Sequence, residues 1–105
     1  MSDPIVIAPE GDIDFSRVDA FRTALMDAAR GAQNRLVVDL SQVDSIDSSA
    51  LGVLVELYNR LRRENRQLAV VAPRGTAAAV ILNLSGLSAR LPTYESPLAL
   101  SERIS

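Results

Sequence analysis

The residues Asp47-Ser48-Ser49 place one acid and two hydroxyls just before hydrophobic spacing that is typical of a helix. They can be a helix cap alone, because Asp and Ser side chains accept hydrogen bonds from the free amides of a helix N-terminus. Alternatively, Ser48 is a phosphoacceptor, because the same amides can hold a phosphate group. A phosphoserine adds roughly −1.5 to −2 charges at neutral pH, which would change the field around Asp47 strongly. The two interpretations are compatible, since a cap serine can also be modified.

Four aspartates lie in the motif or at predicted turns before it, and they are Asp14, Asp39, Asp44 and Asp47. Carboxylates gathered at strand ends can bind magnesium, as they do in phosphoaspartate chemistry. That chemistry also uses a lysine near the phosphate, and this chain contains no lysine. Aspartates are common in turns and caps for reasons that involve no metal. The sequence therefore favours turn and cap roles for these residues, and we expect neither a metal site nor a cofactor.

The overall composition is that of one globular domain over residues 1–105, with 48% hydrophobic residues. Without histidine or cysteine, the chain has no catalytic Ser-His-Asp triad and no thiolate chemistry. The formal net charge is only −2, which argues against a nucleic-acid surface. No secretory signal and no apolar stretch of bilayer length is visible, so we expect a cytoplasmic protein without membrane insertion.

The element that precedes the motif is the apolar, β-branched run Leu36–Leu40, which indicates a strand buried on both faces. The element that follows it is a helix from about Ser48 to Glu64. Its predicted buried positions recur at steps of three and four, and they are Leu51, Leu54, Tyr58 and Leu61. The motif therefore lies where a strand gives way to a helix N-terminus, a common place for ligands in α/β proteins.

The remaining elements alternate between strands and helices. Further strands are predicted at Ile5–Ala8, Gln67–Ala72 and Leu91–Tyr94, the last at an edge because it contains Pro92. Gly11–Asp14 is predicted to be a polar turn. Further helices are predicted from Phe15 to Gly31, from Gly75 or Thr76 to Gly86, and from Ser96 onwards. This order predicts a single α/β domain with a largely parallel sheet of about four strands and about four helices.

Each of these helices has predicted caps and a predicted buried face. For the first, Ser16 is the expected N-cap and Gly31 the left-handed stop, and the buried stripe is Val18, Phe21, Leu25 and Ala28. For the next, the expected face is Val80, Ile81 and Leu84. For the last, Pro97 is the expected first helical residue, and Leu98, Ala99 and Ile104 would dock the helix.

Four motifs, in order along the chain, resemble those of STAS domains of the anti-sigma factor antagonist type. They are Gly11–Asp14, Val38–Ser41 with Val43 and Ile46, Asp47–Gly52, and Leu84–Leu87. The third resembles the phosphorylation motif Asp-Ser-Ser-Gly-Leu-Gly, with Ala50 at the first glycine. An added methyl group there is expected to hinder close approach of a kinase to the backbone. The resemblance covers nearly the whole chain and implies a STAS-like fold.

The resemblance also implies a function in partner switching. Such a protein, when unphosphorylated, binds an anti-sigma factor and so releases a sigma factor for transcription. The anti-sigma factor is an ATP-dependent serine kinase that would phosphorylate Ser48, or less favourably Ser49, and a serine phosphatase would reverse this. The residues implied in partner binding are Asp14, Asp44, Asp47, Ser48, Ser49 and Leu51. The protein would act by binding, not as an enzyme.

Two other classes of function remain as alternatives. A STAS subunit of a membrane transport assembly, such as a lipid-transporting ABC system, binds an ATPase subunit and needs no acceptor serine. The presence of Ser48 and Ser49 favours the switch over this role. A small phosphoaspartate receiver or another enzyme is disfavoured by the missing lysine and histidine.

Overall fold

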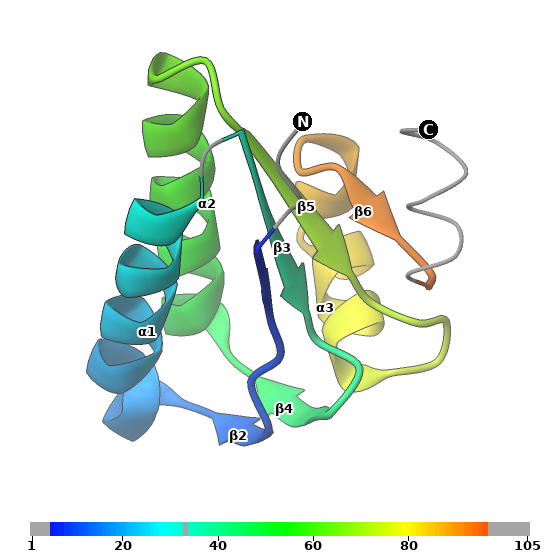
Figure 1. The fold of residues 1–105 in the computed structure, drawn as a ribbon. Coiled ribbons are helices and arrows are strands. Elements are labelled where there is room, and N and C mark those ends of the chain that lie inside the picture. Colours follow the sequence, from blue (N-terminus) through cyan, green and yellow to red (C-terminus); the bar gives the residue numbers. More distant parts are fainter. Residues whose placement is uncertain (1–4, 33, 97–105) are drawn as a thin grey trace.

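Four parallel strands form the main sheet of the protein (Figure 1). The computed structural model describes residues 5–32 and 34–96. The strand order is β1-β3-β5-β6, and the strands are β1 (Ile5–Ile7), β3 (Arg35–Asp39), β5 (Gln67–Val71) and β6 (Thr93–Tyr94). All three neighbouring pairs are parallel. The predicted parallel sheet of four strands is thus confirmed, with the strand that follows Pro92 at its edge.

A second sheet consists of β2 (Gly11–Ile13) and β4 (Val43–Ile46), which also pair in parallel. The prediction of a polar turn over Gly11–Asp14 is therefore wrong, and β4 lies where a loop is expected. Each of these short strands has only one or two apolar side chains, so no hydrophobic run marks it in the sequence. The register shifts between Gly11 and Asp12, and Gly11 has a φ of 79°, which residues with a side chain rarely adopt.

Three α-helices are present in the described part of the chain. They are α1 (Val18–Gly31), α2 (Ser48–Arg63) and α3 (Ala77–Leu84), with 3-10 turns at η1 (Phe15–Arg17) and η2 (Leu87–Ala89). The predicted bounds of α2 are correct to one residue. None of these helices is long and apolar enough to cross a bilayer. The helix predicted from Ser96 onwards, with Pro97, Leu98, Ala99 and Ile104, lies beyond the described residues except for Ser96.

The two central strands of the main sheet, β3 and β5, are buried on both faces. On one face Leu36, Val38 and Val70 belong to the large core cluster, to which all three α-helices contribute. The helical side chains in that cluster include Phe21, Leu25, Leu54, Leu57, Ala78 and Leu82. On the other face Val37, Ala69 and Val71 form a small cluster with Tyr94. The prediction that Leu36–Leu40 is buried on both faces is confirmed, because side chains that alternate along β3 enter different clusters.

The buried face of α3 differs from the predicted one. Leu84 is 82% exposed and Val80 is 50% exposed, so the prediction is wrong for both, whereas Ile81 is partly buried against the core. The residues that α3 buries are Ala78, Ala79 and Leu82. Because this helix is apolar nearly throughout, its periodicity does not identify the inner side, and two alanines allow a closer approach than larger side chains would.

The start and end of α1 also differ from expectation. Ser16 does not cap a helix; it lies in the η1 turn and donates its hydroxyl to the Asp14 carboxylate, with Oγ and Oδ1 2.6 Å apart. Gly31 is the last helical residue and has no left-handed φ, since the extended residue Ala32 ends the helix. The predicted stripe is buried at Phe21 and Leu25 and partly buried at Val18 and Ala28.

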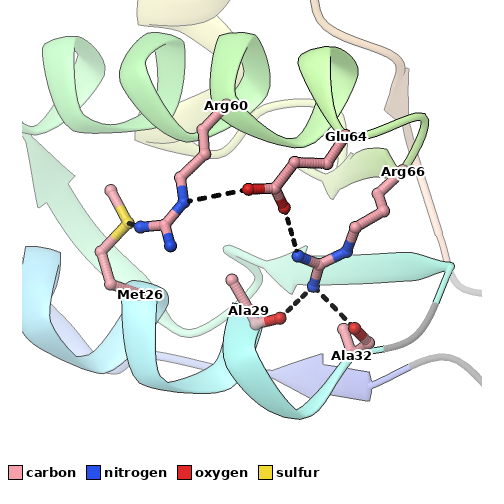
Figure 2. A network of polar contacts seen from close by, with 6 residues as sticks. All are labelled: Met26, Ala29, Ala32, Arg60, Glu64 and Arg66. Atoms are coloured by element: carbon pink, nitrogen blue, oxygen red, sulfur yellow. Dashed lines mark hydrogen bonds and ion pairs between the residues drawn. The ribbon is translucent and has the colours of Figure 1, made fainter.

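Arg66 links the C-terminal ends of α1 and α2 through hydrogen bonds and an ion pair (Figure 2). Its side chain is only 17% exposed. Its Nη2 donates to the carbonyl oxygens of Ala29 and Ala32, the latter at 2.6 Å, and its Nη1 lies 2.6 Å from Oε1 of Glu64. Arg60 reaches the other oxygen of Glu64, at 3.7 Å. One guanidinium therefore supplies the donor for the Ala32 carbonyl and a second donor for the Ala29 carbonyl, which also accepts the Ala32 amide at 3.3 Å.

Candidate functional site

The candidate site lies at the N-terminus of α2, at the same end of the molecule as β2 and β4 (Figure 1). Asp47 is the N-cap of this helix. Its Oδ1 accepts hydrogen bonds from the amides of Ser49 at 3.1 Å and Ala50 at 3.2 Å. The same oxygen accepts the Ser49 hydroxyl at 2.5 Å. The cap interpretation is thereby confirmed, with Asp47 as the capping residue.

The two serines of the motif have different surroundings. Ser49 is half-buried, and its hydroxyl donates to Asp47. Ser48 is exposed, and its hydroxyl has no hydrogen-bond partner in residues 5–32 and 34–96. Ser48 is also the first residue of α2, so it stands at the positive end of the helix dipole. The arrangement leaves one serine hydroxyl engaged in the cap and the adjacent one open to an incoming group.

The loop after β2 is tied to the start of α2. The Asp47 amide donates to the carbonyl oxygen of Ile13, the last residue of β2, at 3.2 Å. Asp14 directly follows this tethered residue, and its carbonyl oxygen accepts the amide of Arg17 at 3.0 Å. Asp14 and Asp47 are thus brought together, although 32 positions of the sequence separate them.

Asp44 is exposed on β4, the strand that leads into the motif. Its neighbour Ser45 donates its hydroxyl to Oδ1 of Asp12 on β2, at 2.7 Å. Sequence reasoning missed Asp12 and Ser45 because it did not expect the two strands that carry them. The apolar pair Val43 and Ile46, which brackets two polar residues, is the weak signal that was available.

Hydrogen bonds favour the charged form of two carboxylates on this face, those of Asp47 and Asp14. The pKa of Asp47 lies below its ordinary value of 3.8, first because the Ser49 hydroxyl donates to it and then because nearby amides do. The pKa of Asp14 is lowered in the same way, chiefly by the Ser16 hydroxyl. In the described part of the chain, no ion pair joins Asp14, Asp44 or Asp47 to a basic residue. Arg17 adds the last of the effects that lower the pKa of Asp14 and donates to the carbonyl oxygen of Asp12 at 3.4 Å, but the acids outnumber it and the face carries net negative charge.

Asp39 does not belong to this face. Its carboxylate accepts the amide of Ser41 at 2.9 Å and the hydroxyl of the same residue, as in an Asx turn. The predicted turn role is confirmed for this aspartate. Among the described residues, no cluster of three or more acidic side chains is arranged to hold a metal ion.

Two residues of the motif lie beneath the site. Ala50 has no exposed surface, so its methyl group fills space in the core and not at the approach to Ser48. This geometry contradicts the expected obstruction of the backbone by that methyl group. Leu51 is only 6% exposed, so it supports the first turn of α2 from below and offers little contact surface.

Phe15 is a residue of this region that sequence reasoning assigned only to a helix start. Its ring is 78% exposed, and it directly follows Asp14 in the tethered loop. The sequence feature that could have identified Phe15 is that it stands between Asp14 and Ser16 and does not belong to the repeating apolar positions of the following helix. The site therefore combines an open serine, a set of unpaired carboxylates and one exposed aromatic ring.

Comparison with known proteins agrees with this geometry. The family model for the STAS domain matches residues 2–97. An anti-sigma factor antagonist from Mycobacterium paratuberculosis is similar in structure, with 31% sequence identity, a TM-score of 0.81, and 92% of this chain and 82% of that chain covered. A candidate anti-sigma factor antagonist from Thermotoga maritima shares the fold at 24% identity, with a TM-score of 0.83 and coverage of 99% and 89%. The chain therefore belongs to the STAS domain family and groups with its anti-sigma factor antagonists.

Proposed function

We propose that this protein is a cytoplasmic anti-sigma factor antagonist that is switched by phosphorylation of Ser48. When unphosphorylated, it binds an anti-sigma factor and so releases a sigma factor; it acts by binding and not as an enzyme. One observation carries the proposal. Ser48 is exposed with an unengaged hydroxyl, whereas the hydroxyl of Ser49 is bound to the capping carboxylate of Asp47. This difference favours Ser48 over Ser49 as the acceptor.

The proposed kinase is the anti-sigma factor itself. It transfers the γ-phosphoryl group of ATP to Oγ of Ser48; the hydroxyl proton is released and ADP leaves. A metal-dependent serine phosphatase then hydrolyses the phosphoserine and restores the hydroxyl. The open position of Ser48 at the first turn of α2 is what both enzymes require, because each must reach Oγ directly.

Phosphorylation would weaken the complex for two physical reasons. A contact surface that fits a hydroxyl has no room for a phosphoryl group and its water shell, and burying a dianion is costly. The added charge of roughly −1.5 to −2 also falls on the face that carries Asp14, Asp44 and Asp47, with which no described basic residue forms an ion pair. Partner groups that pair with these acids are already used in the unphosphorylated complex.

The proposal is tested with Ser48→Ala, Ser48→Asp and the matched control Ser49→Ala. Ser48→Ala should bind the anti-sigma factor within about threefold of the wild type, while Ser48→Asp should bind about 100-fold more weakly. Isothermal titration calorimetry measures the affinities, and mass spectrometry after incubation with kinase and ATP locates the phosphate. Equal affinity of the two Ser48 variants, or phosphate found only at another residue, would overturn the proposal.

The alternative of a transport-assembly subunit predicts different behaviour. Such a subunit would co-purify with an ABC ATPase, and substitutions at Ser48 would leave that association unchanged. The open hydroxyl beside a set of charged acids has no evident use in a purely supporting subunit. A pull-down from the native cell, with and without phosphatase treatment, separates the two roles.

A further inference from the structure

Exposed large apolar side chains are few in the described part of the chain, and Phe15 is the one aromatic ring among them. The others are Ile5, Val6, Val80 and Leu84. Phe15 is 78% exposed, so its ring adds little to the core. Its position distinguishes it from the others, because it follows Ile13 and Asp14, and the Ile13 carbonyl oxygen accepts the amide of Asp47, the cap of the helix that begins at Ser48.

The segment that carries this ring is held in place. The η1 turn is closed by the Arg17 amide, which donates to the carbonyl oxygen of Asp14 at 3.0 Å, and by the Ser16 hydroxyl, 2.6 Å from the Asp14 carboxylate. The residue before Asp14 is held as well, because the Asp47 amide donates to the carbonyl oxygen of Ile13 at 3.2 Å. A side chain presented from a fixed backbone loses little freedom on binding, and such residues are effective anchors in interfaces. Aromatic anchors in particular dominate the binding energy of many protein complexes.

The surroundings of the ring define what could cover it. Asp12, Asp14 and Asp44 are exposed on β2, the following loop and β4, and no described basic residue forms an ion pair with them. Arg17 approaches Asp12 and Asp14, but the three exposed acids outnumber it, so this face is acidic. An exposed aromatic ring on an acidic face fits a partner pocket with apolar walls and a basic rim. It does not fit an anionic lipid surface, which these charges would repel.

We propose that Phe15 is the apolar anchor by which this protein docks on its anti-sigma factor kinase. This inference rests on the proposed function and assigns a further residue to the same face. The ring inserts into an apolar pocket of the kinase, and this contact brings Ser48 to the nucleotide. Phe15 is a positioning residue, because it touches the partner and takes no part in phosphoryl transfer.

The test compares Phe15→Ala with Leu84→Ala, which removes an equally exposed apolar side chain from the C-terminal end of α3. The probe is the purified kinase that labels Ser48 of the wild-type protein in the presence of ATP. Phe15→Ala should weaken binding about 30-fold or more and raise the KM for phosphorylation with little change in kcat. Leu84→Ala should stay within about twofold, and Phe15→Leu should recover much of the affinity because it restores apolar contact.

Each outcome distinguishes the inference from the function on which it rests. If Ser48 is labelled and Phe15→Ala binds within about threefold of the wild type, the anchor assignment is wrong and the switch stands. If no kinase labels Ser48, both fail. Because the ring is exposed, Phe15→Ala should unfold at nearly the wild-type temperature, so weaker binding would not reflect loss of the fold.

Discussion

The two ends of α2 carry opposite charges, and they differ in whether their charged side chains form ion pairs within the protein. At the N-terminal end, Asp47 caps the helix and lies beside Asp14, and neither acid has an ion-pair partner among the described residues. At the C-terminal end, Glu64 binds both Arg60 and Arg66, and Arg66 also holds two carbonyl oxygens from the end of α1 (Figure 2).

The difference means that the two ends of α2 contribute to different properties of the protein, the C-terminal end to stability and the N-terminal end to binding. Polar groups that satisfy one another inside the protein contribute to folding and are not available to a partner. Charges that lie exposed without a partner contribute little to folding, but they are free to bind another molecule. We therefore expect substitutions at the C-terminal end to change mainly the free energy of unfolding. Substitutions at the exposed N-terminal groups should change mainly binding.

The largest effect on stability is expected from Arg66→Leu. The change leaves the carbonyl oxygen of Ala32 without its donor, removes one of two donors from that of Ala29, and removes a partner of Glu64. Leaving such groups unsatisfied should lower the free energy of unfolding by about 2–3 kcal/mol. Urea denaturation followed by circular dichroism measures the change, and the affinity for the anti-sigma factor should stay near the wild-type value.

The matched control is Arg30→Leu, which makes the same replacement at an exposed ion pair with Asp27 on α1. It should change the free energy of unfolding by less than about 1 kcal/mol, because exposed pairs contribute little. Equal losses for the two arginine variants would show that charge alone, and not the fastening of two helix ends, explains the effect at Arg66.

A smaller effect is expected at the other end of the helix from Asp47→Ala. This change removes the acceptor for the amides of Ser49 and Ala50, so the first turn of α2 should fray. The melting temperature should fall by about 4–8 °C, and Asp47→Asn should recover most of it because asparagine also caps helices. Differential scanning calorimetry checks both. A fall as large with asparagine as with alanine would contradict the capping role.

The main sheet could be predicted from the sequence because β1, β3 and β5 lie in apolar runs, whereas β6 is only the two residues Thr93–Tyr94. The bounds of α2 were equally clear, since its apolar side chains recur at helical steps up to Leu61. The second sheet could not be recognised, because β2 and β4 are short and largely polar. The inner face of α3 could not be recognised for the opposite reason: when nearly every residue is apolar, the spacing does not distinguish Leu82 from Leu84.

The candidate site was predictable as a set of residue types, but its arrangement was not. The sequence places Asp47 and Ser48 at a helix start, and the structure confirms this. That Asp14 joins them depends on the pairing of β2 with β4, which no local pattern reveals. Which of the two serines has a free hydroxyl depends on the hydrogen bond from Ser49 to Asp47, and the sequence does not reveal that bond.

The smallest effects concern acid pH, where both ends of α2 should contribute through different interactions. The pKa of Glu64 lies below its ordinary value of 4.5, chiefly because of Arg66, and the pKa of Asp47 lies below 3.8, chiefly because of the Ser49 hydroxyl. A carboxyl whose pKa is lowered on folding binds fewer protons in the folded state than in the unfolded state. Its contribution to stability is therefore complete above the unfolded pKa and is lost as the pH falls through the folded pKa.

The comparison is sharpened by adding salt to this pH titration. Melting temperatures of the wild type, Glu64→Gln and Asp47→Asn are measured from about pH 6 to pH 3, and each variant should lose less stability in acid than the wild type. About 0.5 M NaCl should reduce the difference between the wild type and Glu64→Gln, because salt screens the attraction of the arginines. It should leave the difference for Asp47→Asn nearly unchanged, because the donors to Asp47 are uncharged. An equal salt response at both ends would mean that Asp47 too is held by a charge, and the contrast between the two ends of α2 would fail.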